Sequence, residues 1–278
     1  ALPSGLSIDA TTGKISGNPT VLSTLTTYTV YANNTGGSAT TTIDITVNDV
    51  APSSITYSAT SFVKTKGTPM TTGIPTVFGG PVVSWTINPG LPAGLNIDSS
   101  NGEISGTPSA LSTLTTYTIT ATNSGGSTTA TIDITINDII PSTVSYVPDT
   151  YTFTKGTSDS TSTPNANGGP VVSWEIHPTL PNGLSIDSSS GQISGTPTTL
   201  SPIQTYTVYA NNSGGSATTT IDITVNDIIP SIITYSSSAF VETRGTAMTT
   251  GIPGVSGGPV VTWSIAPALP TGLDIDAS

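Results

Sequence analysis

The chain contains no cysteine and little charge of either sign. Charged residues make up 8% of its 278 positions, and five lysines and arginines against sixteen aspartates and glutamates leave a formal net charge of −11. The absence of cysteine excludes disulfides, thiolate nucleophiles and zinc–thiolate centres. With so few cations the chain builds no basic patch, so we expect it to bind neither nucleic acid nor an anionic membrane surface.

Long apolar runs and targeting signals are also missing. No run approaches the ~18 residues that a membrane-spanning helix needs, so we expect no direct membrane insertion by this segment. The first residue is Ala1 and no signal peptide follows it. The sequence opens inside a motif that recurs later, so we expect both ends to be cut faces of a longer polyrepeat chain. The alternative is that the two ends complement each other between neighbouring subunits.

An internal repeat organises the whole chain. The phrase Leu-Pro-x-Gly-Leu begins at Leu2, Leu91, Leu180 and Leu269, in steps of 89 residues that no insertion or deletion interrupts. This period is too long for a solenoid turn or a propeller blade, and it suits one β-sandwich domain of about 90–100 residues. The predicted domains are the second half of a repeat, two complete repeats and the first half of another, at 1–49, 50–138, 139–227 and 228–278.

Within each repeat, apolar residues alternate with Thr and Ser. In Thr131–Ile136 the isoleucines share one face and polar residues share the other, which is typical of half-buried antiparallel strands. No segment shows helical spacing. Asn123–Gly126 predicts a hairpin turn. We therefore predict an all-β fold of tandem antiparallel sandwiches, with strands in the first complete repeat at about 55–57, 61–65, 74–77, 82–87, 94–97, 117–122 and 127–136.

The residues that could support chemistry favour structural roles. Trp85, Trp174 and Trp263 follow Gly-Gly-Pro on alternating strands, so we expect core side chains rather than sugar-stacking platforms. Tyr117 is predicted to be buried with its hydroxyl bonded to backbone. The single histidine, His177, has no nucleophile paired with it in a recognisable pattern, and we expect an exposed position at a strand end.

Repeated carboxylates also favour a structural interpretation. Asp9, Asp98, Asp187 and Asp276 recur in every copy within a Ser-, Thr- and Gly-rich turn. Asp side chains accept hydrogen bonds from nearby backbone amides in such turns. No catalytic pair remains after these assignments, so we expect no enzyme activity.

Three stretches carry a resemblance to a known family. They are Gly94–Asp98 with Gly102–Gly106, Tyr117–Asn123, and Ile132–Asp138. Together they resemble the putative-Ig repeats of bacterial and archaeal surface proteins, which are related to the dystroglycan-type cadherin-like domain. The resemblance covers every copy. It implies an Ig-like or cadherin-like β-sandwich, an extracellular location at the cell surface, and a role in adhesion or as a spacer.

Cadherins bind calcium between domains, so the resemblance raises the possibility of calcium here. The matching acidic positions at the repeat ends are Asp49, Asp138 and Asp227, each preceded by Asn. Ser105–Pro108 replaces another acidic motif of cadherins, and Asn123 stands where they carry Asp. Calcium takes six to eight oxygen ligands, and these residues supply few. We therefore predict no obligatory cofactor, with interdomain calcium as the alternative.

Two copies contain an Asn-x-Ser/Thr sequon in the predicted hairpin, at Asn33 and Asn211, while the middle copy has Thr122 there. Such sequons are acceptors for N-glycosylation, so we note Asn33 and Asn211 as candidate glycosylation sites.

Two classes of function remain open. The gapless copies favour a structural segment of a large surface protein, such as a stalk, sheath, S-layer or filament. The alternative is an adhesin module that binds a cell-surface partner or glycan. Asn137–Pro141 joins one repeat to the next without a loose linker, and Pro restricts this junction, so we predict a stiff rod. The expected partners are neighbouring repeats and other copies in a fibre or surface layer.

Overall fold

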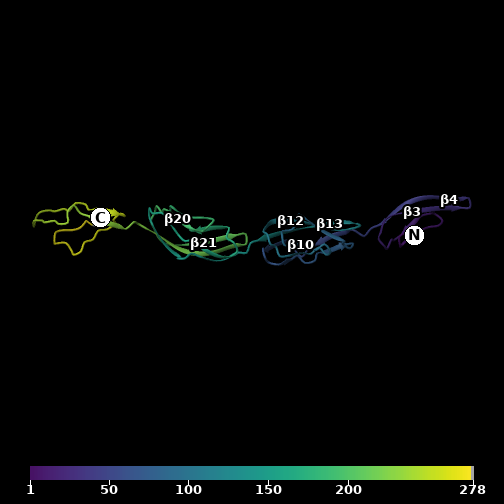
Figure 1. The fold of residues 1–278 in the computed structure, drawn as a ribbon, viewed down its shortest axis with the longest axis horizontal. Helices are drawn as coiled ribbons and strands as arrows, with labels where there is room; N and C mark the ends of the chain where they lie inside the picture. The colour runs from purple at the N-terminus through teal and green to yellow at the C-terminus, as the bar shows by residue number, and fades with distance from the viewer. Residues whose placement is uncertain (277–278) are drawn as a thin grey trace. The chain divides into compact units, whose positions relative to one another are not determined.

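The computed structural model describes residues 1–276, which fold into strands and turns with no helix among them. The chain divides into two compact units, Ala1–Asp138 and Ile139–Ser278. Each unit contains one complete repeat and one partial repeat (Figure 1). The all-β prediction is confirmed.

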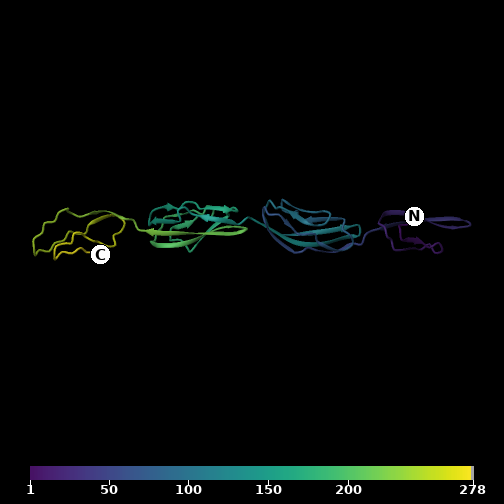
Figure 2. The ribbon, with the colours of Figure 1, turned by 90° about the horizontal axis from the view of Figure 1, so that it is seen from below.

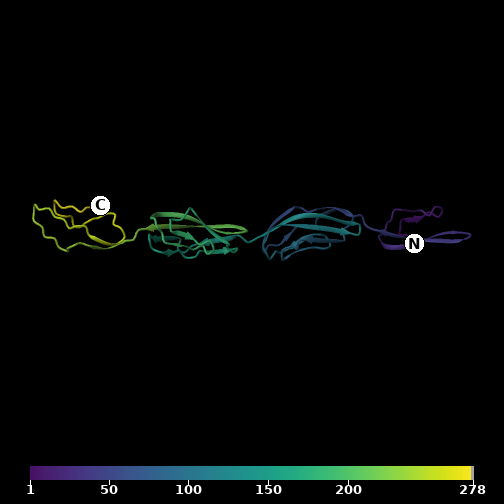
Figure 3. The ribbon, with the colours of Figure 1, turned by 90° about the horizontal axis from the view of Figure 1, so that it is seen from above.

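The complete repeat of the first unit is built from nine strands in three sheets. One sheet has four strands in the order β6-β13-β12-β9, a second has three in the order β10-β11-β7, and β5 pairs with β8. Seen from below and from above, the strands lie in two layers (Figure 2, Figure 3). The strands are β5 Pro52–Thr56, β6 Ser61–Thr65, β7 Met70–Thr71, β8 Thr76–Gly79, β9 Ser84–Asn88, β10 Leu95–Ile97, β11 Ile104–Gly106, β12 Ser112–Asn123 and β13 Gly126–Asn137.

The complete repeat of the second unit has the same topology. Its four-stranded sheet has the order β15-β22-β21-β18, its three-stranded sheet the order β16-β20-β19, and β14 pairs with β17. The strands are β14 Pro141–Ser145, β15 Thr150–Thr154, β16 Asp159–Ser160, β17 Asn165–Gly168, β18 Ser173–His177, β19 Leu184–Ile186, β20 Ile193–Gly195, β21 Ser201–Asn212 and β22 Gly215–Asn226.

The partial repeats contain the matching fractions of this topology. The amino-terminal one pairs β1 with β2 and β3 with β4, and the carboxyl-terminal one pairs β23 with β24. Their bounds are β1 Leu6–Ile8, β2 Ile15–Gly17, β3 Ser23–Asn34, β4 Gly37–Val47, β23 Pro230–Thr234 and β24 Gly254–Gly257.

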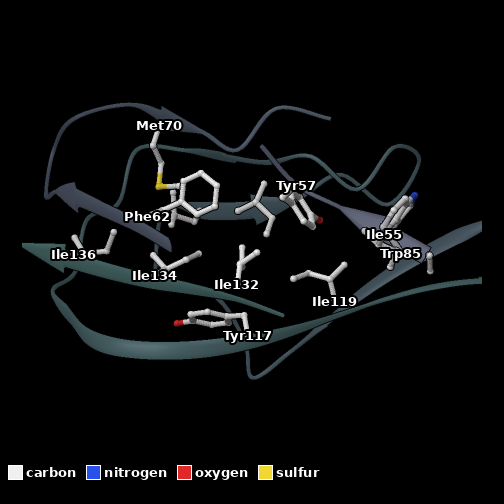
Figure 4. Close-up of a cluster of buried hydrophobic side chains, with 13 residues drawn as sticks. Ile55, Tyr57, Phe62, Met70, Trp85, Tyr117, Ile119, Ile132, Ile134 and Ile136 are labelled. Atoms are coloured by element: carbon white, nitrogen blue, oxygen red, sulfur yellow. The ribbon is translucent and has the colours of Figure 1, made fainter. Parts of the chain in front are cut away.

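The core of each complete repeat lies between its layers. In the first unit, Ile119 on β12 and Ile132, Ile134 and Ile136 on β13 are at most 1% exposed, because alternate residues of both strands face inward. Phe62 and Met70 lie over this row, and Tyr57, Ile55 and Trp85 continue the core toward the other end (Figure 4). The second unit has an equivalent core, with Val208 and Val225 at the positions of Ile119 and Ile136. Tyr151 stands at the position of Phe62, and the buried Phe153 stands at that of Lys64.

One pairing differs in direction from all the others in the complete repeats. β6 runs parallel to β13, with Ser61 opposite Asp133 and Thr65 opposite Asn137. β15 runs parallel to β22 in the same way. All other paired strands are antiparallel. Along the chain, the earliest strand of each four-stranded sheet (β6 or β15) therefore runs in the same direction as the latest (β13 or β22).

The predicted strands need several corrections. The predicted strand 61–65 matches β6, and the long strands begin or end within five residues of the prediction. The prediction missed β7 and β11, and it placed 74–77 where the structure has β8 at Thr76–Gly79. Two- and three-residue strands carry too few residues to show alternation, so their pairing depends on long-range packing.

Candidate functional site

An asparagine at the end of β12 ties the hairpin of the first complete repeat to two distant segments. Nδ2 of Asn123 donates to the carbonyl oxygens of Val50 (2.7 Å) and Pro81 (2.9 Å). Its Oδ1 accepts from the amides of Gly125 (2.8 Å) and Gly126 (3.2 Å). Asn123 is 8% exposed, and both amide hydrogens and the oxygen are used. We call this arrangement the asparagine clamp.

The clamp holds the chain where it enters the repeat. The amide of Asp49 donates to the hydroxyl of Ser124 (2.9 Å), and a Cβ on Gly125 would lie only 2.0 Å from the carbonyl oxygen of Asp49. Only glycine allows this approach. The segment before β5 is therefore held directly against the β12–β13 hairpin.

The second complete repeat contains the same clamp. Nδ2 of Asn212 donates to the carbonyl oxygens of Ile139 (2.6 Å) and Pro170 (3.0 Å), and its Oδ1 accepts from Gly214 and Gly215. The sequence showed the hairpin that contains this residue, but not the two carbonyl acceptors.

Trp85 and Trp174 lie in the core, as predicted, whereas Trp263 in the carboxyl-terminal partial repeat is only half-buried and lies outside any strand. Trp85 and Trp174 are each 5% exposed. The ring of Trp85 covers Gly102, where a Cβ would lie 2.7 Å from Cδ2 of the ring. The Tyr57 hydroxyl donates to the carbonyl of the same glycine (2.7 Å), and burial raises the pKa of Tyr57 to about 12. Trp174, Tyr146 and Gly191 form the equivalent group in the second unit.

The predictions for the buried tyrosine are confirmed only in part, and the prediction for His177 is confirmed. Tyr117 and Tyr206 are buried, but the Tyr206 hydroxyl bonds Oε1 of Gln204 (3.3 Å) rather than the backbone. The backbone bond expected of Tyr117 is made instead by Tyr57, which sequence reasoning missed. His177 ends β18, is exposed, and its ring contacts Tyr209 edge-on with centroids 5.7 Å apart.

Three of the four recurrent aspartates, Asp9, Asp98 and Asp187, are turn residues, as predicted, and the role of Asp276 stays a prediction. Oδ1 of Asp98 accepts from the amide and the hydroxyl of Ser100, at 2.7 and 2.5 Å. These bonds hold the pKa of Asp98 below its ordinary value. Asp187 accepts from the amides of Ser189 and Ser190, and Asp9 from those of Thr11 and Thr12, with the same direction of pKa shift.

The candidate calcium residues are spread along the chain. Asp49 and Asp227 are half-buried and Asp138 is 7% exposed. Within residues 1–276, no group of three or more His, Cys, Asp or Glu side chains could hold a metal ion. The amide of Asn123 at the position that aligned with a cadherin aspartate is already engaged in the clamp. Calcium binding at the three aspartates stays a prediction.

The sequon asparagines lie at the ends of β3 and β21. Oδ1 of Asn33 accepts from the Ser38 hydroxyl, and Oδ1 of Asn211 accepts from the Ser216 hydroxyl, both at 2.5 Å. Each asparagine stands two residues after a tyrosine on the same strand, Tyr31 or Tyr209.

No helix in the described part of the chain is long and apolar enough to cross a membrane. Strands and turns supply all the residues considered above.

Comparison with known proteins gives matches to surface and Ig-domain proteins. The chain is 29% identical over 154 residues to "Serine-rich adhesin for platelets" of Staphylococcus aureus, a match that covers 54% of this chain and 7% of that protein. The same protein of strain MRSA252 matches at 29% over 154 residues, covering 11% of its length. The chain therefore corresponds to a small part of these curated relatives.

Solved structures with a similar fold are more distant. An I-band fragment, I67–I69, from titin is 15% identical with a TM-score of 0.43, covering 80% of this chain and 83% of that one. The four amino-terminal Ig domains of Dscam1 isoform 1.9 are 13% identical with a TM-score of 0.39, covering 69% and 52%.

A family model described as "Putative Ig domain" matches the chain three times, at residues 1–48, 52–137 and 133–226. These matches cover most of the sequence and include both complete repeats. The chain belongs to the Putative Ig domain family.

Proposed function

We propose that this chain is a force-transmitting repeat segment of a large extracellular surface protein. In this role the repeats form a stiff stalk or filament at the cell surface, bounded at 1–49, 50–138, 139–227 and 228–278. Their partners are neighbouring repeats of the same chain and other copies in a fibre or surface layer. The segment has no catalytic role. The parallel pairing of β6 with β13 is the observation that carries this proposal.

Along the chain, β6 is the earliest and β13 the latest strand of the four-stranded sheet, and their parallel pairing determines how tension acts on this sheet. Pulling on the two ends of the chain draws β6 and β13 past each other along their axes. The hydrogen bonds between them are then loaded together rather than one after another. Two further backbone bonds extend this ladder, from Asp133 to the carbonyl of Thr60 and from Lys66 to that of Asn137, both 2.8 Å.

The second complete repeat supports the same role. The β15–β22 ladder is also extended at both ends, by bonds from Asp222 to Asp149 (2.9 Å) and from Lys155 to Asn226 (2.8 Å). The asparagine clamp adds a second set of hydrogen bonds that fixes the chain near the start of each complete repeat. A recognition module would instead be expected to diverge in its loops, whereas the loops of these copies keep the same length.

Single-molecule force spectroscopy tests this function. The chain has no cysteine, so pairs of cysteine handles can be placed uniquely. Ala59→Cys with Ile139→Cys pulls β6 and β13 from opposite ends of their ladder. Lys66→Cys with Ile139→Cys pulls the same strands apart from one end and serves as the matched control. We expect unfolding forces several-fold higher in the first geometry; equal forces would contradict the proposal.

The adhesin function is the second candidate. Its support is the similarity to a part of the platelet adhesin, together with the cell-surface location that both functions share. Binding of the purified chain to intact host cells would favour it, provided that the binding is lost when the outward-facing strand residues are changed and the fold is kept.

A further inference from the structure

The two sequons coincide with the two aromatic replacements on one sheet face. Position 120 in the middle copy is Thr, and the equivalent residues are Tyr31 and Tyr209. Position 122 is also Thr, and its equivalents are Asn33 and Asn211. Tyrosine and asparagine are thus present together in two copies and absent together from the third.

Strand geometry puts each pair of side chains on the same face. Residues two apart on a strand point to the same side and are about 7 Å apart. The cross-strand register agrees, because Tyr31 lies opposite Thr40 and Asn33 opposite Ser38, and the second pair lies opposite Thr218 and Ser216. Both tyrosines lie outside the hydrophobic core, and Tyr31 is 63% exposed.

In the β21–β22 hairpin, the two neighbouring asparagines differ in how they are bonded. Both amide hydrogens of Asn212 are used by the clamp. Asn211 accepts a hydrogen bond through Oδ1 from Ser216, and within residues 1–276 no acceptor bonds its Nδ2. Asn33 has the same arrangement with Ser38. The sequon asparagine therefore presents its nitrogen for modification while its oxygen is held.

We propose that Asn33 and Asn211 carry N-linked glycans and that Tyr31 and Tyr209 pack against the first sugar of each. In the transfer, the bond between C1 of the first sugar and the phosphate oxygen of a lipid-linked oligosaccharide donor breaks. A bond forms between C1 and Nδ2, Nδ2 loses a proton, and the lipid phosphate leaves. The ring of the tyrosine then covers the apolar CH face of the attached sugar.

The surroundings of Tyr209 agree with this arrangement. Glu175 lies directly across from Tyr209 in the sheet, and His177 contacts the ring edge at an interplanar angle of 77°. In the middle copy these positions are Thr86 and Asn88. The histidine contact limits the orientations of the tyrosine ring above the strand.

The inference rests on the proposed extracellular location, because transfer takes place on secreted chains. The whole chain can be secreted from a yeast host that performs N-glycosylation. The host's secretory pathway then replaces the proposed extracellular location, so the glycosylation inference is tested separately from the proposed function. Intact-mass spectrometry should show two glycans. Asn33→Gln and Asn211→Gln should each remove one, and unoccupied sites would overturn the inference while leaving the mechanical function untouched.

The middle copy provides a gain-of-function test. Thr120→Tyr with Thr122→Asn creates the same pair in that copy, and we expect a third glycan. Thr122→Asn alone is the matched variant that has the sequon without the ring.

Packing by tyrosine is tested by stability. After trimming to one sugar per site, the Tm should exceed that of the fully deglycosylated chain by a few degrees. Tyr31→Thr and Tyr209→Thr, which copy the residue of the middle repeat, should abolish this difference. A difference that persists without the tyrosines would overturn the packing proposal.

Discussion

At the scale of single residues, the turn glycine under the tryptophan is a tightly constrained position of each complete repeat. Gly102 has a φ of +79°, its carbonyl accepts from Tyr57, and the Trp85 ring leaves no room for a Cβ. The positive φ and the packing of the ring therefore both select glycine there. The sequence showed a glycine in a turn, but it could not show which ring covers it.

Replacing this glycine should lower the free energy of unfolding by more than the strain of a positive φ alone would. Gly102→Ala is expected to destabilise the repeat by about 2–4 kcal/mol, because left-handed strain and overpacking add. Gly67→Ala is the matched control: its φ is also +79° and nothing lies within 4 Å of its Cβ position, so about 1–2 kcal/mol is expected. Hydrogen exchange in the peptides of β12 and β13 measures both. Equal losses would contradict the contact with Trp85.

The buried phenol of Tyr57 predicts sensitivity to alkali. Its pKa is raised to about 12 by burial, against about 10 for an exposed tyrosine. The unfolded chain therefore loses this proton first, so stability is full below pH ~10 and declines as the pH rises toward 12. Thermal melts between pH 8 and 12 should show this decline.

Tyr57→Phe should make the decline in that pH range shallower, at the expense of the hydrogen bond to Gly102. Tyr31→Phe changes an exposed ring and serves as the matched control. Burial also raises the pKa of Tyr146 in the second unit. Replacing both Tyr57 and Tyr146 with Phe should therefore flatten the dependence of stability on pH further.

At the scale of strands, the sequence predicts the elements whose signal is local. β12 and β13 are long, alternate strictly and are joined by a turn that contains two glycines, so both strands and their hairpin were predictable. Pairing between distant segments was not. Met70 pairs with Gly106, and Ser61 pairs in parallel with Asp133. No pattern of neighbouring residues specifies such partners.

Part of the candidate site could also be predicted from local sequence, and part could not. The burial of the tryptophans follows from alternation, and the aspartate turns follow from composition. The clamp does not, because the carbonyls that Asn123 binds belong to residues 73 and 42 positions away. An asparagine before two glycines looks like an ordinary turn residue until the chain is folded.

The clamp predicts that aspartate cannot replace asparagine in a complete repeat. Asn123→Asp puts a carboxylate against the carbonyl oxygens of Val50 and Pro81 and removes both donors, so we expect a loss of at least ~2 kcal/mol. Asn34→Asp is the control, since the described contacts of Asn34 include only the bond from Gly36 to its Oδ1. Urea denaturation of the two variants should separate them. A mild effect at Asn123 would show that the clamp is dispensable.

At the scale of the whole molecule, calcium is the ligand most worth testing. The acidic positions Asp49, Asp138 and Asp227 recur in every copy, yet the described residues hold no cluster of three metal-binding side chains. We expect small-angle scattering of the chain to be the same with calcium and with a chelator. A chelator-dependent change, abolished by Asp138→Asn, would instead establish calcium between the repeats.

The direction of the terminal strands has a consequence for how such a protein changes over generations. Since β6 and β13 run in the same direction, the polypeptide leaves the four-stranded sheet of a repeat in the direction in which it enters that sheet. An 89-residue unit can be duplicated or deleted without altering the strand pairing inside the other complete repeats. Unequal recombination between near-identical coding repeats should therefore yield length variants that fold, and closely related strains should differ in repeat number rather than in repeat length.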